Sequence, residues 1–267
     1  MIGTVYLVGA GPGAADLLTL RAARLLEHAD IVFHDALVPQ EILALSAKAK
    51  KIEVGKRSGR YSTAQIFINK QLVDAACKYK VVVRLKGGDP MLFGRAHEEV
   101  SFLRKHRIKV EIVPGITAAL AAAAELQVSL TRRGSARSVA FVTPRVGKGQ
   151  PQSTWISAAL AADSVAIYMG AGEAREISRA LIGAGKPAST PIAVIENASL
   201  PGARRHFGTL KELEQVASKG SGGPSLILLG EALRDSAIIG AWHSEQSSSL
   251  PTARATRSGR GRSGSSR

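Results

Sequence analysis

The chain has 267 residues, of which 45% are hydrophobic and 21% charged, so its composition is that of an ordinary globular protein and excludes a wholly disordered chain. Its apolar runs fall short of the roughly 18 residues that a membrane-spanning helix needs, so we expect no membrane association. The start lacks the features of a signal peptide, and the single cysteine, Cys77, cannot form an internal disulfide. We therefore predict a cytoplasmic protein in which Cys77 is buried and inert.

Positive charge is the second feature of the composition. Lysine and arginine exceed aspartate and glutamate by 15 charges, which favours an anionic ligand. The segment 246–267 holds +5 of these charges and too few apolar residues to offset its ordering entropy, so we predict a disordered basic tail at 244–267. The body keeps +10. An anion- or nucleic-acid-binding protein driven by the tail is the non-enzymatic alternative, and binding lost on deletion of 246–267 would identify it.

Short apolar runs rich in β-branched residues alternate with Ala- and Leu-rich helical stretches along the chain. Strands are expected at 4–8, 31–34, 81–85, 110–113, 139–143, 165–169, 192–195 and 226–229. Helices are expected near 15–28, 39–49, 63–79, 94–106, 115–126, 153–161, 173–183 and 209–218. This alternation predicts an α/β protein with largely parallel sheets. We interpret 129–138 as a linker, which gives two α/β domains, 1–130 and 131–243, followed by the tail 244–267.

A glycine-rich loop follows the first expected strand. Residues 8–13 read V-G-A-G-P-G, and with Ala14 they satisfy the dinucleotide fingerprint G-x-G-x-x-G/A. Asp35 ends the next strand, where such folds place the acid that binds ribose. Pro12 argues against a dinucleotide because its ring removes a backbone N–H that a pyrophosphate would use. An NAD-dependent oxidoreductase therefore stays an alternative that rests on these residues alone.

Two further loops leave the ends of expected strands. Residues 84–90 read R-L-K-G-G-D-P, and residues 113–119 read V-P-G-I-T-A-A at the start of an Ala-rich helix. Ligands of open α/β sheets collect outside the carboxyl ends of the strands, so the loops predict one shared binding site. Thr117 could either cap the helix or bind the ligand, and both interpretations stay open.

The three loops, in this order and spacing, resemble the tetrapyrrole methylase superfamily and, within it, the uroporphyrinogen-III C-methyltransferases. Other segments that match are D-L-L-T-L, A-D-I-V-F-H-D, E-V-G-K-R, S-L-T-R-R, Y-M-G, I-E-N-A and P-S-L-I-L-L-G-E. The resemblance covers roughly residues 2–240 and leaves the tail unexplained. It implies two α/β domains with the active site in the cleft between them, and a homodimer.

The resemblance also implies the residues of the site. S-adenosyl-L-methionine would be bound by Pro12, Gly87, Gly88, Asp89, Leu92, Thr117, Ala118, Met169 and Ala198. Relatives often carry glycine at the position of Ala198, and glycines where Ala96 and His97 stand. Ordinary core packing is the alternative for Met169.

Five further residues are implied to serve the reaction. Asp35 resembles the proton acceptor and Lys56 the donor, whereas Arg95, Glu98 and Arg133 resemble residues that hold the tetrapyrrole or assist proton removal. Each has a plainer alternative. Asp35 could cap a helix, Lys56 could belong to a solvated basic loop, and Arg95 and Glu98 could form a surface ion pair.

The reaction implied is methylation of uroporphyrinogen III at C-2 and C-7, through precorrin-1 to precorrin-2, with S-adenosyl-L-homocysteine as second product. Sirohaem, cobalamin or haem d1 would follow. The substrate carries many carboxylates, which arginine binds bidentately, so the body charge fits it without a specific nucleic acid. A methylase of a later precorrin, or of RNA or protein, is the alternative within the superfamily. The histidines show no metal-ligand spacing, and we expect no metal.

Overall fold

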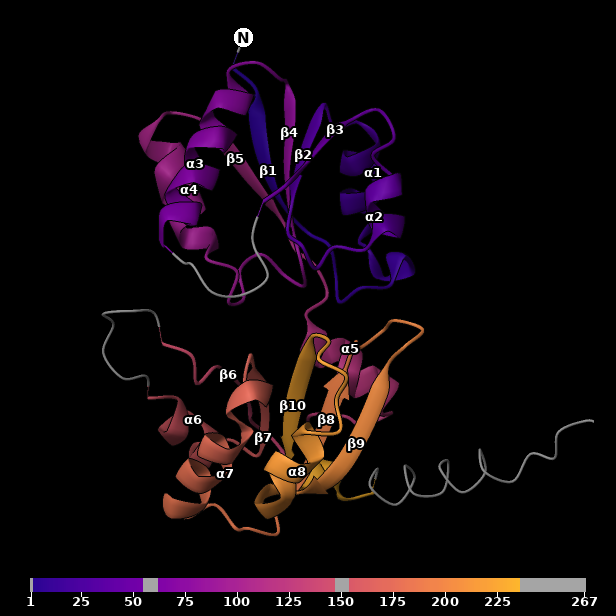
Figure 1. The fold of residues 1–267 in the computed structure, drawn as a ribbon, viewed down its shortest axis with the longest axis vertical. Coiled ribbons are helices and arrows are strands. Elements are labelled where there is room, and N and C mark those ends of the chain that lie inside the picture. The colour runs from indigo at the N-terminus through magenta and orange to yellow at the C-terminus, as the bar shows by residue number, and fades with distance from the viewer. Residues whose placement is uncertain (1, 55–61, 147–153, 236–267) are drawn as a thin grey trace, which may run out of the picture.

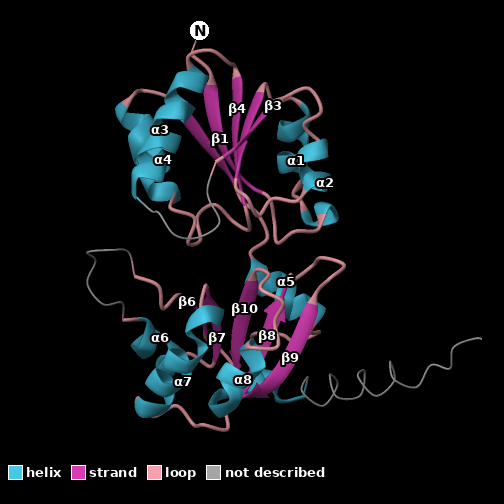
Figure 2. Cartoon of the chain, viewed as in Figure 1, coloured by secondary structure: helices cyan, strands magenta, loops and turns pink. Residues whose placement is uncertain are grey.

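The computed structural model describes residues 2–54, 62–146 and 154–235. These residues form two five-stranded sheets that follow one another along the chain, each covered by helices (Figures 1 and 2). Within the described ranges, no helix has the length and apolar character needed to cross a membrane. The eight expected strands all form, with ends within one residue of those predicted from the sequence.

The first sheet has the strand order β3-β2-β4-β1-β5, and all its neighbours are parallel. Its strands are β1 (Thr4–Gly9), β2 (Ile31–His34), β3 (Lys50–Glu53), β4 (Val81–Lys86) and β5 (Lys109–Val113). Helices α1 (Leu20–Glu27) and α2 (Gln40–Ala44) cover one face, and α3 (Ser62–Ala76) and α4 (Ala96–Lys105) cover the other (Figure 1). All five strands point their carboxyl ends toward the second sheet (Figure 1).

The second sheet has the order β6-β7-β10-β8-β9. Its strands are β6 (Val139–Val142), β7 (Ser164–Tyr168), β8 (Pro191–Glu196), β9 (Arg204–Thr209) and β10 (Ser225–Gly230). Helices α6 (Trp155–Ala161), α7 (Ala174–Gly183) and α8 (Leu213–Ala217) pack on one face. Helix α5 (Ala118–Glu125) packs on the other. Short 3₁₀ turns are η1 (Ala15–Leu17), η2 (Ala171–Glu173), η3 (Leu210–Glu212) and η4 (Glu231–Leu233).

The expectation of largely parallel sheets is correct for the first sheet and wrong for the second. Only β6 and β7 are a parallel pair there, whereas β10 is antiparallel to β7 and β8, and β8 is antiparallel to β9. The connection 197–203 is too short for the crossover that parallel neighbours need, so β8 and β9 form an antiparallel pair. Strand β10 then inserts between β7 and β8.

Helix α5 lies before the boundary at residue 130 that the sequence predicted, yet it packs on the second sheet. Its buried residues Ala119 and Ala122 join Ala166, Ala193 and other side chains of that sheet in one apolar cluster. Alanine has no side chain beyond Cβ, so the helix can approach the strands closely. The packing therefore favours a boundary between β5 and α5.

The expectation that Cys77 is buried is also wrong. Helix α3 ends at Ala76, and the next residue, Cys77, is exposed rather than buried. The position lies in the turn that follows the helix, so the apolar face of α3 does not extend to it.

Candidate functional site

The three loops that follow β1, β4 and β5 meet at the carboxyl ends of these strands. Gly11 and Gly88 exchange backbone hydrogen bonds, with N–O distances of 3.2 and 2.7 Å. A Cβ on Gly115 would lie 2.3 Å from the carbonyl oxygen of Gly88, and one on Gly9 would lie 2.6 Å from Gly115. Gly9 and Gly115 are needed because backbone packs on backbone, whereas Gly11 and Gly88 have φ angles of 72° and 66°, in the left-handed region that favours glycine.

Gly87 differs from its neighbours. It is exposed, its φ is not positive, and the nearest atom to a Cβ placed on it would be Leu37 Cβ at 4.0 Å. Neither turn geometry nor packing therefore requires glycine at this position. Open backbone at the end of a parallel strand is the feature expected where a ligand approaches the chain closely.

Asp89 organises the loops. One carboxylate oxygen accepts the N–H of Met91 at 2.7 Å, and the other accepts the N–H of Gly115 at 2.9 Å. The carboxylate thus ties the β4 loop to the β5 loop. Leu92 follows in the same turn and is half-buried, as is Pro12 in the β1 loop. The structure brings these residues and Gly88 to one edge of the first sheet.

Thr117 stands at the N-cap of α5, but its side chain does not cap the helix. Its hydroxyl lies 2.7 Å from the Tyr168 hydroxyl, which also accepts the N–H of Ala119 at 3.2 Å. The capping interpretation of Thr117 is therefore wrong, because the phenol at the end of β7 takes that role. Burial raises the pKa of Tyr168 above its ordinary value, which favours the neutral phenol. Ala118, the first residue of α5, lies half-buried between these contacts.

Side chains of the two halves meet beside this contact. The Phe93 ring, in the loop after β4, lies 5.1 Å from the Tyr168 ring. Ser199 Oγ accepts the N–H of Ala14 at 3.0 Å, which joins the β1 loop to the turn after β8. Ala198 is buried in that turn. The sequence marked Y-M-G as a matching segment, but nothing in it singled out Tyr168.

Met169 is 43% exposed and has a φ of 56°, in the left-handed region. The alternative of ordinary core packing is therefore wrong for Met169. An exposed thioether directly after the contact of Tyr168 with Thr117 is available to a ligand.

Asp35 lies at the end of β2, where its Oδ1 accepts a hydrogen bond from Arg84 at 2.5 Å. The α2 N-cap is Pro39, so the side chain of Asp35 does not cap that helix. Arg95 and Glu98 form the ion pair that the plainer alternative describes, with N–O distances of 2.8 and 2.7 Å. The hydrogen bond from Arg95 lowers the pKa of Glu98.

Among the described residues, Arg133 is the predicted site residue that the contacts do not join to these loops. Lys56 lies outside the described residues. Arg133 belongs to an exposed turn closed by Arg132 and Ala136, and Arg132 pairs with Asp235 at 3.0 Å. The turn is thus held by the segment that follows β10.

Three charged residues that the sequence analysis missed lie under the site. Arg84, Lys86 and Glu99 are buried, and the two cations each form an ion pair with Glu99. Burial, together with the neighbouring charge of Arg84, lowers the pKa of Lys86. Burial also acts to lower the pKa of Arg84, but the carboxylates of Asp35 and Glu99 outweigh it, so the pKa of Arg84 is raised. The R-L-K pattern on a strand was a usable signal, because residues two apart point to one face.

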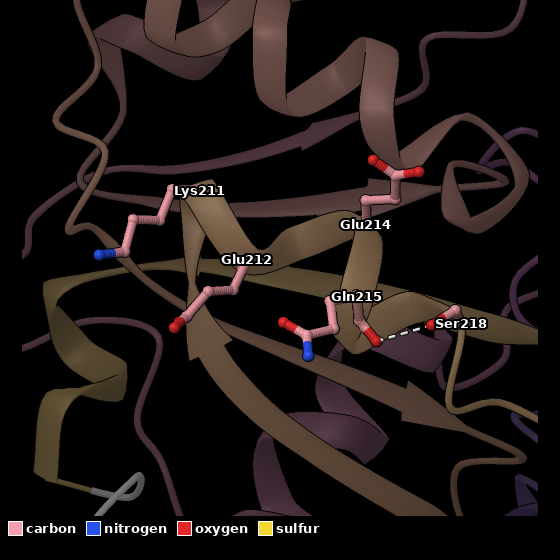
Figure 3. A pocket seen from close by; sticks show the side chains of 5 residues that line it. All are labelled: Lys211, Glu212, Glu214, Gln215 and Ser218. Atoms are coloured by element: carbon pink, nitrogen blue, oxygen red, sulfur yellow. Dashed lines mark hydrogen bonds between the residues drawn. The ribbon is translucent and has the colours of Figure 1, made fainter.

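The structure has two surface hollows, one away from these loops and one beside the β1 loop. One has a volume of about 470 Å³. Its lining residues, drawn in Figure 3, are Lys211, Glu212, Glu214, Gln215 and Ser218. The carboxylates of Glu212 and Glu214 already bind Thr209 and Arg175, so these groups are not available to bind a ligand. The other, of about 540 Å³, lies between the β1 loop and α5 and is lined mainly by apolar side chains. Within the described ranges, no group of three or more His, Cys, Asp or Glu could hold a metal ion.

Comparisons with known proteins identify the family of this chain. Residues 4–214 match the family of Tetrapyrrole (Corrin/Porphyrin) Methylases. A siroheme synthase of Psychrobacter cryohalolentis is 42% identical over 234 residues, which are 87% of this chain and 45% of that protein. The chain thus spans about half the length of the curated relatives it matches.

Solved structures match over nearly their whole length. A uroporphyrin III C-methyl transferase of Thermus thermophilus has a TM-score of 0.76 at 38% identity, covering 87% of this chain and 94% of that one. The same enzyme complexed with S-adenyl homocysteine matches at 39% identity. A cobalt precorrin-4 methyltransferase also has a TM-score of 0.76, at 28% identity, covering 86% of this chain and 95% of that one.

Proposed function

The chain belongs to the tetrapyrrole methylase family, and from this premise we propose that it methylates uroporphyrinogen III at C-2 and C-7. The product is precorrin-2, formed through precorrin-1, and S-adenosyl-L-homocysteine is released. One observation carries the proposal. Three loops converge at the ends of parallel strands, and the exposed Gly87 among them has no structural reason to be glycine.

S-adenosyl-L-methionine is the methyl donor, and its sulfonium methyl group is already electrophilic. The protein then has to hold the methyl group of the donor in line with a pyrrole carbon of the substrate. The open backbone at Gly87, the exposed Met169 and the N-terminus of α5 fit such a ligand. We propose that it is held by the residues that the sequence predicted: Pro12, Gly87, Gly88, Asp89, Leu92, Thr117, Ala118, Met169 and Ala198.

Proton removal from the macrocycle needs a base near its edge. Asp35 suits this role because its carboxyl group is partly exposed at a strand end and has a fixed partner in Arg84. The exposed ion pair of Arg95 and Glu98 could open to bind substrate carboxylates, because such surface pairs contribute little to stability. We propose the same for Arg133, and a donor role for Lys56.

A methylase acting on a later precorrin is the second candidate. It is favoured by the cobalt precorrin-4 methyltransferase, which matches as well in TM-score. Uroporphyrinogen III is the better proposal because the Thermus enzyme is more similar in sequence, 38% against 28% identity. An NAD-dependent oxidoreductase is not favoured, since its only support was the fingerprint of the β1 loop. We further propose a cytoplasmic homodimer that supplies sirohaem, cobalamin or haem d1 synthesis.

The experiment is anaerobic incubation with uroporphyrinogen III and S-adenosyl-L-methionine, followed by mass spectrometry of the tetrapyrrole. The proposal expects a gain of two methyl groups, with a first intermediate that has gained one. Asp35→Ala and Arg95→Ala should reduce turnover and leave S-adenosyl-L-methionine binding by calorimetry largely intact. No methylation by a chain that still binds the donor would move the substrate to a later precorrin. Normal turnover in both variants would contradict the roles assigned to these two side chains.

A further inference from the structure

Four charged side chains form a cluster at the carboxyl ends of β2 and β4. We call Asp35, Arg84, Lys86 and Glu99 the buried charge cluster. Arg84 and Lys86 are alternate residues of β4, and Glu99 lies on α4, which covers that face of the sheet. Arg84, Lys86 and Glu99 have side chains at most 4% exposed, whereas that of Asp35 is 32% exposed. Asp35 is therefore the member through which the cluster reaches the site.

Glu99 is the fixed centre of the cluster. Its Oε1 accepts from Arg84 Nε at 3.1 Å and from Lys86 Nζ at 3.2 Å, and its Oε2 accepts from the same ammonium at 3.2 Å. Gln65 on α3 adds a fourth hydrogen bond of 3.1 Å to Oε1. A carboxylate held by three side chains from β4 and α3 has one orientation available.

Arg84 transmits that orientation to Asp35. Its Nε is held by Glu99, one terminal nitrogen donates to the carbonyl oxygen of Leu85 at 3.2 Å, and the other lies 2.5 Å from Asp35 Oδ1. The guanidinium is planar and rigid, so fixing two of its nitrogens fixes the third. The position of the Asp35 carboxylate therefore depends on Glu99, a residue that does not reach the site surface.

The cluster also balances charge. It contains two cations and two carboxylates, so a proton or a side chain lost from one member leaves an uncompensated charge in a buried position. Well-packed apolar residues often stabilise a core as well as buried ions do. Stability alone thus does not explain why ions occupy these positions. The need to fix a carboxylate at the end of β2 does explain it.

We propose that Glu99 is a positioning residue that acts through Arg84 to hold the Asp35 carboxylate in the orientation needed for proton transfer. The inference rests on the proposed function, because it requires that Asp35 act on the tetrapyrrole. Lys86 neutralises the second charge of the cluster and keeps Glu99 from turning away from Arg84. Glu99 itself touches neither substrate nor donor.

A double-mutant cycle tests the proposal, with kcat measured for the wild type, Asp35→Asn, Glu99→Gln and the double variant. Glu99→Gln should lower kcat about 10- to 100-fold, because a small misplacement of a reacting group has effects of this size. In the Asp35→Asn background the same change should cost less than about twofold, because residues that act as a unit are not additive. The affinity for S-adenosyl-L-methionine should stay within about twofold in all four proteins. Arg104→Gln, on the exposed side of α4, is the matched control and should leave kcat unchanged.

The outcomes separate the inference from the proposed function. An equal loss of kcat in both backgrounds would show that Glu99 serves the fold and not Asp35, and would overturn the inference alone. Full turnover in Asp35→Asn would overturn the role of Asp35 and the inference with it. A wild-type chain that leaves uroporphyrinogen III unmethylated would overturn the proposed function as well.

Glu99→Gln removes a buried charge, so a second variant guards against loss of the fold. Arg84→Lys keeps the charge but cannot span from Glu99 to Asp35, and the same non-additive cycle with Asp35→Asn is expected. Lys86→Met combined with Glu99→Gln restores the charge balance and should recover part of kcat. If Arg84→Lys and Asp35→Asn were additive, the proposal would be wrong.

Discussion

Gly87 and Gly115 belong to two of the loops that meet at the first sheet, and glycine stands at the two positions for different physical reasons. Backbone atoms surround Gly115, whereas open space surrounds Gly87. In the sequence both lie in loops that follow expected strands, and residue type alone cannot separate a packing glycine from one that faces a ligand. The distinction appears only when the loops are placed against each other.

This contrast predicts opposite effects of the same substitution. Gly115→Ala should lower the free energy of unfolding by about 1–3 kcal/mol, because its Cβ would overlap the carbonyl oxygen of Gly88 at 2.3 Å. Gly87→Ala should leave stability nearly unchanged but weaken S-adenosyl-L-methionine binding. Urea unfolding and calorimetry measure the two properties. Unchanged donor affinity in Gly87→Ala would show that the ligand does not approach this backbone.

At the scale of elements, the start of α5 is held by a residue from outside the helix. Tyr168 caps its first turn at the N–H of Ala119 and bonds the Thr117 hydroxyl. Tyr168→Phe should therefore lower the free energy of unfolding by about 0.5–2 kcal/mol, the usual cost of a lost cap. Adding Thr117→Val should cost less than it does in the wild type, because its partner is already gone. Equal costs in both backgrounds, measured by urea unfolding, would contradict the role of the phenol.

The turn at 221–223 depends on one carboxylate at the end of β8. Glu196 is buried and accepts the N–H groups of Ser221 and Gly223, and these hydrogen bonds, that of Ser221 first, hold its pKa below the ordinary value. A pKa depressed in the folded state gives stability that is present above the unfolded-state pKa and is lost as the pH falls through the folded-state pKa.

Glu196→Gln should accordingly cost about 1.5–3 kcal/mol at pH 7, the range for hydrogen bonds to charged groups. The difference from the wild type should shrink as the pH is lowered below the usual glutamate pKa of about 4.3. Urea unfolding at several pH values measures it. A difference that does not change with pH would show that the ionised form of Glu196 is not the source of the stabilisation.

The elements also show where the sequence was sufficient. Central strands such as β2 and β10 are continuous apolar runs, and their residues alone predict them. Strands β3 and β9 were missed because they lie at sheet edges and carry charge, with the sequences K-K-I-E and R-R-H-F-G-T. Charged residues protect an edge from pairing with other chains, and they remove the apolar signal of a strand at the same time.

The buried charge cluster was missed for a related reason. Arg84, Lys86 and Glu99 are ordinary surface residue types, and their burial depends on where α4 lies on the first sheet. The loops that carry the motifs do meet in the structure, because parallel strands bring their carboxyl ends to one edge of the sheet. Motifs thus predicted that these loops meet, whereas the partners of Asp35 could be identified only from the fold.

For the whole molecule, the distribution of charge separates the segment 246–267 from the rest of the chain. This segment holds five arginines and no acid, and the remaining residues still carry +10, which is enough to attract a substrate with many carboxylates. Deleting 246–267 should therefore leave kcat and KM for uroporphyrinogen III within about twofold of the full chain.

The dependence of KM on salt concentration tests whether the segment 246–267 contributes to substrate binding. If the segment helped to capture the substrate, the deletion would raise KM at low ionic strength, and the difference would disappear near 1 M salt, where the screening length falls to about 3 Å. Steady-state kinetics of both chains at two salt concentrations distinguish the cases. A KM that rises only for the truncated chain, and only at low salt, would assign substrate capture to the arginines of 246–267. Equal KM values under both conditions would leave recognition of the carboxylates to the remaining basic residues, with Arg95 and Arg133 the first to replace.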